Sequence, residues 1–145
     1  MRGRESLVLD ASVALAWGLE DESNAYTDEV LDEMENREAI VPCIWPLEVS
    51  NALLVAERRG RVTRAMVAGF LEYLGSLPVV VEQCDSERIF GEVLLLAREQ
   101  GLSVYDAAYL DLALRLGLPL ATQDDALRTA ASRVGVEIFG KRGKE

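Results

Sequence analysis

Histidine is absent from the 145 residues of this sequence. Its absence excludes Ser-His-Asp triads, histidine general bases and zinc sites with imidazole ligands. Lysine occurs only at Lys141 and Lys144, which argues against a P-loop lysine and against a buried lysine nucleophile. Any chemistry must therefore be carried by carboxylates, hydroxyls and arginines.

Cysteines and long apolar runs are also scarce. Cys43 and Cys84 match neither a C-x-x-C motif nor a disulfide framework, so in a reducing compartment each is most simply a small apolar residue. No stretch approaches the roughly 20 apolar residues of a membrane span. The charged start, residues 1–6, precedes only a short apolar run that contains Asp10. We therefore expect a cytoplasmic protein without membrane contact.

The length is that of one ordinary domain, and 50% hydrophobic residues supply a sizeable core. We expect a single domain over residues 1–145, with a frayed tail at residues 141–145. The 25 acidic and 15 basic residues give a net charge of −10. This charge works against loose adhesion to nucleic acid or anionic lipid, so a polyanionic substrate would need local positive charge.

Short apolar runs alternate with longer stretches of helical period, which is typical of a parallel sheet flanked by helices. We expect an α/β, three-layer fold with a short, mostly parallel sheet of about five strands. The expected strands are residues 7–10, 40–42, 79–82, 118–122 and 136–139. Each is apolar on both faces, as a covered parallel strand should be.

The helices between these strands have recognisable ends. Pro46 suits the first turn of a helix over residues 45–59, and Gly60 ends it. Capping residues open three more helices, which are expected from Thr63 to about residue 76, from Ser86 to residue 100, and from Ser103 to near residue 117. Shorter helices are expected over residues 12–17, 24–37 and 124–133.

Four acids stand at strand ends or helix starts: Asp10, Glu48, Asp106 and Asp124. Ligands of an open parallel sheet bind beyond the carboxyl ends of its strands, where the next helices begin. A single acid at such a place is explained by structure alone, because a helix N-terminus favours a negative charge. Asp106 also fits a capping box with Ser103. The joint pattern of four acids predicts a shared acidic crevice.

Such a cluster needs compensation. Two carboxylates about 5 Å apart, at an effective dielectric constant near 20, repel by about 3 kcal/mol, which exceeds what helix dipoles return. A bound cation, an arginine, or protonation of one carboxyl would relieve this. Oxygen ligands suit Mg²⁺ or Mn²⁺. Such a site fits phosphodiester cleavage, because the metal activates water and neutralises charge on the phosphate.

Polar neighbours accompany these acids. Ser12 and Thr122 lie beside Asp10 and Asp124, where their hydroxyls either bind a metal-bound water or a phosphate oxygen or cap the local backbone. Asn51 follows Glu48 by three residues and is placed to orient its carboxylate. Asp125, next to Asp124, leaves open which of the two is the fourth acid.

Four motifs together resemble the PIN-domain nucleases, and more specifically the toxin component of VapBC-type toxin–antitoxin pairs. They are LVLDAS at residues 7–12, PLEVSNAL at 46–53, SVYDAAYLDLA at 103–113 and LATQDDAL at 120–127. The resemblance implies a metal-dependent endoribonuclease that uses Mg²⁺ or Mn²⁺, with Asp10, Glu48, Asp106 and Asp124 as catalytic and metal-binding acids. It also implies homodimerisation and neutralisation by a small antitoxin, which charge suggests would place an arginine in the acidic pocket.

The densest basic cluster surrounds Gly60 and contains Arg58, Arg59, Arg61 and Arg64. These arginines either contact RNA phosphates or an acidic segment of the partner, or serve only as helix-end and solvated charges.

Two other functions compete with the nuclease. One is a phosphatase that uses Asp10 as its nucleophile, although the sequence lacks a second Asp in Asp10-Ala11-Ser12 and a core lysine. The other is a non-catalytic module whose acidic pocket receives an arginine from a partner. Metal-dependent cleavage of RNA distinguishes the nuclease from both.

Overall fold

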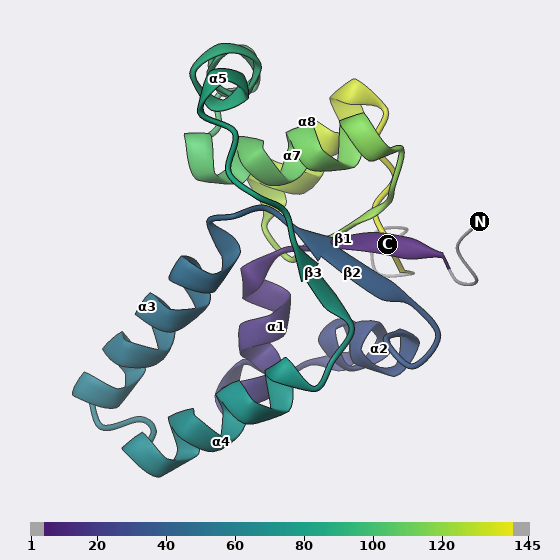
Figure 1. Cartoon of the computed structure of the whole chain (residues 1–145). Coiled ribbons are helices and arrows are strands. Elements are labelled where there is room, and N and C mark those ends of the chain that lie inside the picture. Colours follow the sequence, from purple (N-terminus) through teal and green to yellow (C-terminus); the bar gives the residue numbers. More distant parts are fainter. Residues whose placement is uncertain (1–4, 141–145) are drawn as a thin grey trace.

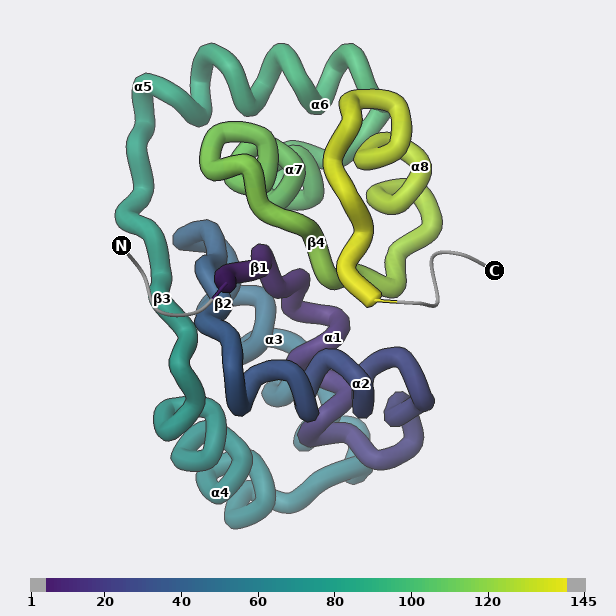
Figure 2. Tube along the Cα trace, turned by 90° about the vertical axis from the view of Figure 1, so that its right-hand side faces the viewer, coloured from purple at the N-terminus to yellow at the C-terminus, as the bar shows by residue number. Residues whose placement is uncertain are grey.

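A computed structural model describes residues 5–140, so the expected tail at residues 141–145 lies outside the described residues. A parallel sheet in the order β3-β2-β1-β4 forms the centre. Its strands are β1 (Ser6–Leu9), β2 (Glu38–Val41), β3 (Val79–Val81) and β4 (Leu120–Ala121). Helices lie on both sides of this sheet (Figures 1 and 2). The predicted three-layer α/β fold is confirmed.

The two helical layers come from the two halves of the chain (Figure 1). One layer contains α1 (Ala11–Gly18), the short helix η1 (Glu20–Glu22), α2 (Ala25–Glu33), α3 (Trp45–Arg58) and α4 (Arg64–Gly75). The other contains α5 (Ser86–Arg88), the π-helical turn η2 (Ile89–Val93), α6 (Leu94–Gln100), α7 (Val104–Leu116) and α8 (Asp125–Val134). Because the strands are parallel, their carboxyl ends all open at one edge.

Local capping sets several helix ends as expected. Met66 donates its backbone N–H to Thr63 Oγ1 at 3.1 Å, and Asp106 donates its backbone N–H to Ser103 Oγ at 3.0 Å. The helix expected to be capped by Ser86 differs, because Asp85 provides the cap and η2 interrupts the helix before α6. Gly101 ends α6 with a φ of 68°, a conformation that glycine adopts without strain.

The expected fifth strand, residues 136–139, is wrong. This segment makes only an isolated parallel bridge, between Leu120 and Ile138. β4 is two residues long, so it offers little backbone for further pairing. In residues 5–140 the sheet therefore has four strands rather than about five.

The interpretation of the cysteines as two separate apolar residues is also wrong. Cys43 and Cys84 form a disulfide with a Cα–Cα distance of 5.3 Å. The register explains the pairing, because Val41 pairs with Val81 and each cysteine follows the end of its strand by two or three residues. Adjacent parallel strands thus deliver the two thiols to the same edge of the sheet.

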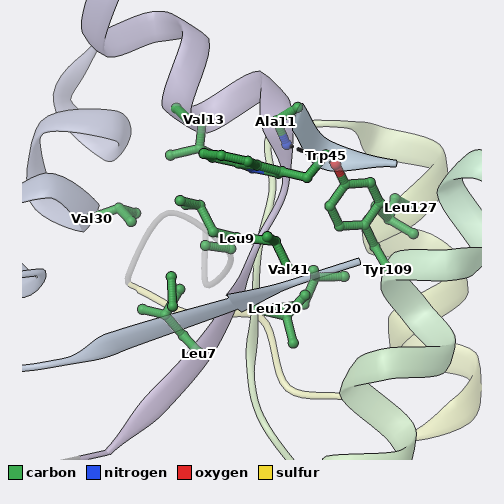
Figure 3. Packing of buried hydrophobic residues seen from close by; sticks show 14 of the residues in the cluster. Leu7, Leu9, Ala11, Val13, Val30, Val41, Trp45, Tyr109, Leu120 and Leu127 are labelled. Atoms are coloured by element: carbon green, nitrogen blue, oxygen red, sulfur yellow. Dashed lines mark hydrogen bonds between the residues drawn. The ribbon is translucent and has the colours of Figure 1, made fainter. Parts of the chain in front are cut away.

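The core surrounds β1, where Leu7, Val8 and Leu9 are fully buried. A central strand covered by helices on both faces must be apolar throughout, as these residues are. Side chains from α1, α2, α3 and α7 pack around it, including Val13, Val30 and Tyr109 (Figure 3). Within residues 5–140, the helices are too short or too polar to cross a membrane.

Candidate functional site

Asp10 and Thr122 meet at the carboxyl edge because of the strand register. Leu9 of β1 pairs with Ala121 of β4, so the next residue of each strand leaves the sheet beside the other. Thr122 Oγ1 donates to Asp10 Oδ2 at 2.6 Å, and Ser12 Oγ donates to the same oxygen at 2.8 Å. Asp10 is only 7% exposed. Two hydroxyls therefore hold a buried carboxylate at the mouth of the sheet.

Glu48 reaches the same region from α3. It lies in the first turn of that helix and is half-buried. Its Oε1 accepts a hydrogen bond from the Tyr109 hydroxyl at 2.5 Å, and that hydroxyl accepts one from the Ala11 backbone N–H at 3.3 Å. Contacts among α3, α7 and the start of α1 thus define the position of Glu48.

Asp106 and Asp124 come from the starts of α7 and α8. Asp106 lies in the first turn of α7 and is half-buried. Asp124 is exposed and caps α8, because its Oδ2 accepts the Leu127 backbone N–H at 3.0 Å. Asp124 is therefore the cap of α8, although capping occupies only one of its two carboxylate oxygens. Of the capping box expected for Ser103 and Asp106, the structure shows one half, the bond from the Asp106 backbone N–H to Ser103 Oγ.

The charges of these acids act on one another. Burial raises the pKa of Asp10 above its ordinary value, and the nearby charge of Asp124 adds to the rise. Burial also raises the pKa of Glu48, with further increases from Asp10 and Asp106. The pKa of Asp106 is raised by burial and then by Asp124 and Asp10. The fold therefore brings the four acids into one electrostatic neighbourhood.

No arginine relieves this repulsion in the described part of the chain. The ion pairs within residues 5–140 use other acids, namely Glu5, Asp21, Glu22, Glu33, Glu82, Glu92 and Asp111. Hydrogen bonds from Thr122 and Ser12 lower the pKa of Asp10 in part, but they bring no positive charge. The cluster is therefore an uncompensated group of carboxylates.

The donor set suits a hard cation, since carboxylate and hydroxyl oxygens are the ligands that Mg²⁺ and Mn²⁺ prefer. The side chains do not yet form a cage. Among residues 5–140, no group of three or more acids, cysteines or histidines is arranged closely enough to hold a metal ion. A cation would have to draw the carboxylates together from their present positions.

Two residues expected to assist the four acids, Asn51 and Asp125, are exposed. Asn51 is exposed, and in the described residues no hydrogen bond joins it to Glu48. Asp125 is the exposed first residue of α8. Its neighbour Asp124 raises the pKa of both Asp10 and Asp106. Electrostatics therefore favour Asp124 as the fourth acid.

The arginine cluster lies at the far end of α3. Ten residues separate Glu48 from Arg58, which corresponds to about 15 Å along the helix axis. Arg61 Nη2 pairs with Asp21 at 2.8 Å and with Glu22 at 3.1 Å. Arg58, Arg59 and Arg64 are exposed. One member thus holds η1 in place, and the other three face solvent away from the acids.

Tyr109 is the site residue to which the sequence analysis assigned no role. Two signals were available. It follows Asp106 by three residues and so lies on the same side of α7, and a buried tyrosine hydroxyl usually finds a polar partner. Neither signal identifies that partner, because Glu48 lies 61 positions away in the chain.

Comparison with known proteins identifies the family to which this fold belongs. The family model described as PIN domain matches residues 7–132, so the chain belongs to the PIN domain family. Ribonuclease VapC3 of Pyrobaculum aerophilum is 27% identical over 121 residues, which span 83% of this chain and 91% of that protein.

Solved structures share the fold. The crystal structure of PAE2754 from Pyrobaculum aerophilum has 30% sequence identity and a TM-score of 0.67, over 88% of this chain and 84% of that chain. VapBC2 from Rickettsia felis, bound to a DNA fragment from its promoter, matches with 12% identity and a TM-score of 0.63, over 92% of this chain and 96% of that chain. The second likeness concerns the fold alone.

Proposed function

We propose that this protein is a Mg²⁺- or Mn²⁺-dependent endoribonuclease and the toxin of a toxin–antitoxin pair. Membership in the PIN domain family and the similarity to Ribonuclease VapC3 support this activity. The observation that carries the proposal is the acidic cluster, in which three carboxyls have raised pKa values and none of the four acids has a cationic partner within residues 5–140.

The residues divide the work as follows. Asp10, Glu48, Asp106 and Asp124 would hold the cation, which when bound supplies an activated water and neutralises charge on the phosphate. Ser12 and Thr122 keep Asp10 oriented through their two hydrogen bonds to Oδ2. These residues are far apart in the sequence and are brought together at the carboxyl edge of the sheet, so the intact fold is required for activity.

The proposal includes partners. A small antitoxin would place an arginine among the four acids and so supply the charge that they lack, and the toxin would form a homodimer in the cytoplasm. Arg58, Arg59 and Arg64 are exposed and could contact RNA phosphates or an acidic antitoxin segment. Arg61 is a weaker candidate, because Asp21 and Glu22 already neutralise it.

Cleavage of single-stranded RNA by the purified protein, with and without Mn²⁺, tests the activity. We expect Asp10→Asn and Asp106→Asn each to reduce metal-dependent cleavage by at least about 100-fold, because each removes a ligand. Glu72→Gln, on the exposed side of α4, is the matched control and should cut RNA like the wild type. Circular dichroism would establish that all variants are folded.

A second measurement separates metal binding from turnover. Mn²⁺ should raise the melting temperature of the wild type, since it binds the folded state preferentially, and should not do so for Asp10→Asn. Wild-type protein that binds metal but cuts no RNA from a broad panel would indicate the non-catalytic module. A trapped adduct of Asp10 with a phosphate mimic would indicate the phosphatase.

A further inference from the structure

Tyr109 is a buried polar side chain at the edge of the acidic cluster. Its ring is fully buried in the core beneath the site, and Figure 3 shows its oxygen directed toward Ala11. The hydroxyl donates to Glu48 Oε1 at 2.5 Å and accepts from the Ala11 backbone N–H at 3.3 Å. One atom of α7 therefore connects α3 with the residue that follows Asp10.

Glu48 needs such a tether more than Asp10 does. Asp10 is nearly buried and accepts hydrogen bonds from two hydroxyls. Glu48 is half-buried on a longer, flexible side chain, and in residues 5–140 its carboxylate is hydrogen-bonded only to Tyr109. The charges of Asp10 and Asp106 repel this carboxylate. A short hydrogen bond to an ionised group is strong enough to oppose that repulsion.

We infer that Tyr109 is a positioning residue, which holds Glu48 beside Asp10 so that the acids can bind one divalent cation. This inference rests on the proposed function. The phenol leaves Glu48 Oε2 free to ligate, while Oε1 is bound. The rigid ring, packed among core residues, sets the position of the hydroxyl more firmly than a solvent-exposed side chain could.

Mn²⁺ binding measured by isothermal titration calorimetry provides the test. Tyr109→Phe keeps the ring but removes the hydroxyl, and we expect its Mn²⁺ affinity to fall by about 10-fold. Tyr105→Phe is the matched control, because Tyr105 is 59% exposed on the same helix and makes no hydrogen bond to Glu48 in the described residues. Its affinity should equal that of the wild type.

A double-mutant cycle distinguishes positioning from general stabilisation. If Tyr109 acts through Glu48, then adding Tyr109→Phe to Glu48→Ala should cost no further Mn²⁺ affinity. An equal loss in both backgrounds would overturn the inference, as would wild-type affinity in Tyr109→Phe. If Tyr109→Phe does not fold, Glu48→Asp replaces it, because the shorter side chain keeps a carboxylate but withdraws it from the Tyr109 hydroxyl. Wild-type Mn²⁺ affinity in that variant would likewise overturn the inference.

Failure of the proposed function gives a different pattern. Wild-type protein that binds no Mn²⁺ would overturn both the nuclease proposal and the role of Tyr109. If the wild type binds Mn²⁺, Asp10→Asn does not, and Tyr109→Phe binds it as the wild type does, then only the role of Tyr109 is overturned.

Discussion

Two aspartates on α7 lie in opposite electrostatic surroundings. Asp106 has no cationic partner in the described residues, and burial and its acidic neighbours raise its pKa. Asp111, five residues later, is 5% exposed, and burial alone would raise its pKa. Hydrogen bonds from Arg88 and Arg115 instead hold the pKa of Asp111 below its ordinary value.

The pairing of Asp111 is extensive. Arg88 donates from Nε to Oδ2 at 2.9 Å and from Nη2 to Oδ1 at 2.7 Å. Arg115 donates to Asp111 Oδ2 at 3.0 Å and forms two more hydrogen bonds with Glu82, beyond β3. Two kinds of acid therefore lie on α7. Asp111 belongs to an ion-pair network that joins α7 to Arg88 and Glu82, whereas Asp106 has no cationic partner in the described residues. In the proposed nuclease, Asp106 is the acid of this pair that helps to bind the cation.

The largest expected effect comes from breaking the satisfied network. Asp111→Asn leaves two half-buried guanidinium groups short of their shared partner, so the free energy of unfolding should fall by about 3 to 5 kcal/mol. Urea unfolding of the variant and of Glu72→Gln, the exposed control, measures this difference. A loss no larger than that of the control would show that the network contributes little to stability.

The disulfide beside this network should have the next largest effect. Cys43, Cys84, Arg88 and Asp111 line the same cavity of about 630 Å³. Reduction of a bond that joins residues 41 positions apart frees the unfolded chain, which should lower the free energy of unfolding by about 2 to 4 kcal/mol. Urea unfolding with and without dithiothreitol measures the change. The double variant Cys43→Ala/Cys84→Ala should not respond to dithiothreitol, and a response would point to a different cause.

The smallest expected effect on stability comes from Asp106, the acid of α7 without a cationic partner in the described residues. Without metal, Asp106→Asn removes one repelling charge and should raise the free energy of unfolding by up to about 1 kcal/mol near neutral pH. The wild type should lose stability as pH rises from the ordinary aspartate pKa of 3.8 through the raised pKa of Asp106, because the folded state holds that proton more tightly. The variant should lose less over this window.

Asp111 contributes with the opposite sign. Its stabilisation is present above 3.8 and disappears as pH falls through its lowered folded pKa. Urea unfolding in EDTA at several pH values, for the wild type, Asp106→Asn and Asp111→Asn, checks both signs. A clear loss of stability in Asp106→Asn would show that its place at the helix N-terminus outweighs the repulsion.

Much of the fold was predictable because local signals determine it. Thr63 and Ser103 cap their helices as expected, since each bond spans only three residues of backbone. Short apolar runs identified β1 to β4 for a similar reason, although β3, at the edge of the sheet, leaves Val80 and Val81 exposed. The prediction of a strand at residues 136–139 failed because such a strand must pair with β4. The short length of β4 is not encoded in residues 136–139 themselves.

The site was predictable only in part. The positions of Asp10, Glu48, Asp106 and Asp124 at strand ends and helix starts predicted that these acids lie near one another, because parallel topology collects such positions, and their mutual effects on pKa agree with this. The hydrogen bond of Tyr109 to Glu48 was not predictable. A tyrosine three residues after an acid is common in helices, and this spacing does not reveal a partner 61 positions away. The opposite surroundings of Asp106 and Asp111 were equally hidden, because the sequence shows two aspartates on one helix.

The sequence by itself narrowed the groups available for chemistry, since a chain without histidine and with lysine only at positions 141 and 144 is left with carboxylates, hydroxyls and arginines. It also determined where helices begin and which runs are buried. Tertiary structure alone decided the partners: Cys43 with Cys84, Tyr109 with Glu48, and Arg88 with Asp111. Caps and apolar patterns act over a few residues, whereas these pairs depend on strand order and helix packing across the whole sheet.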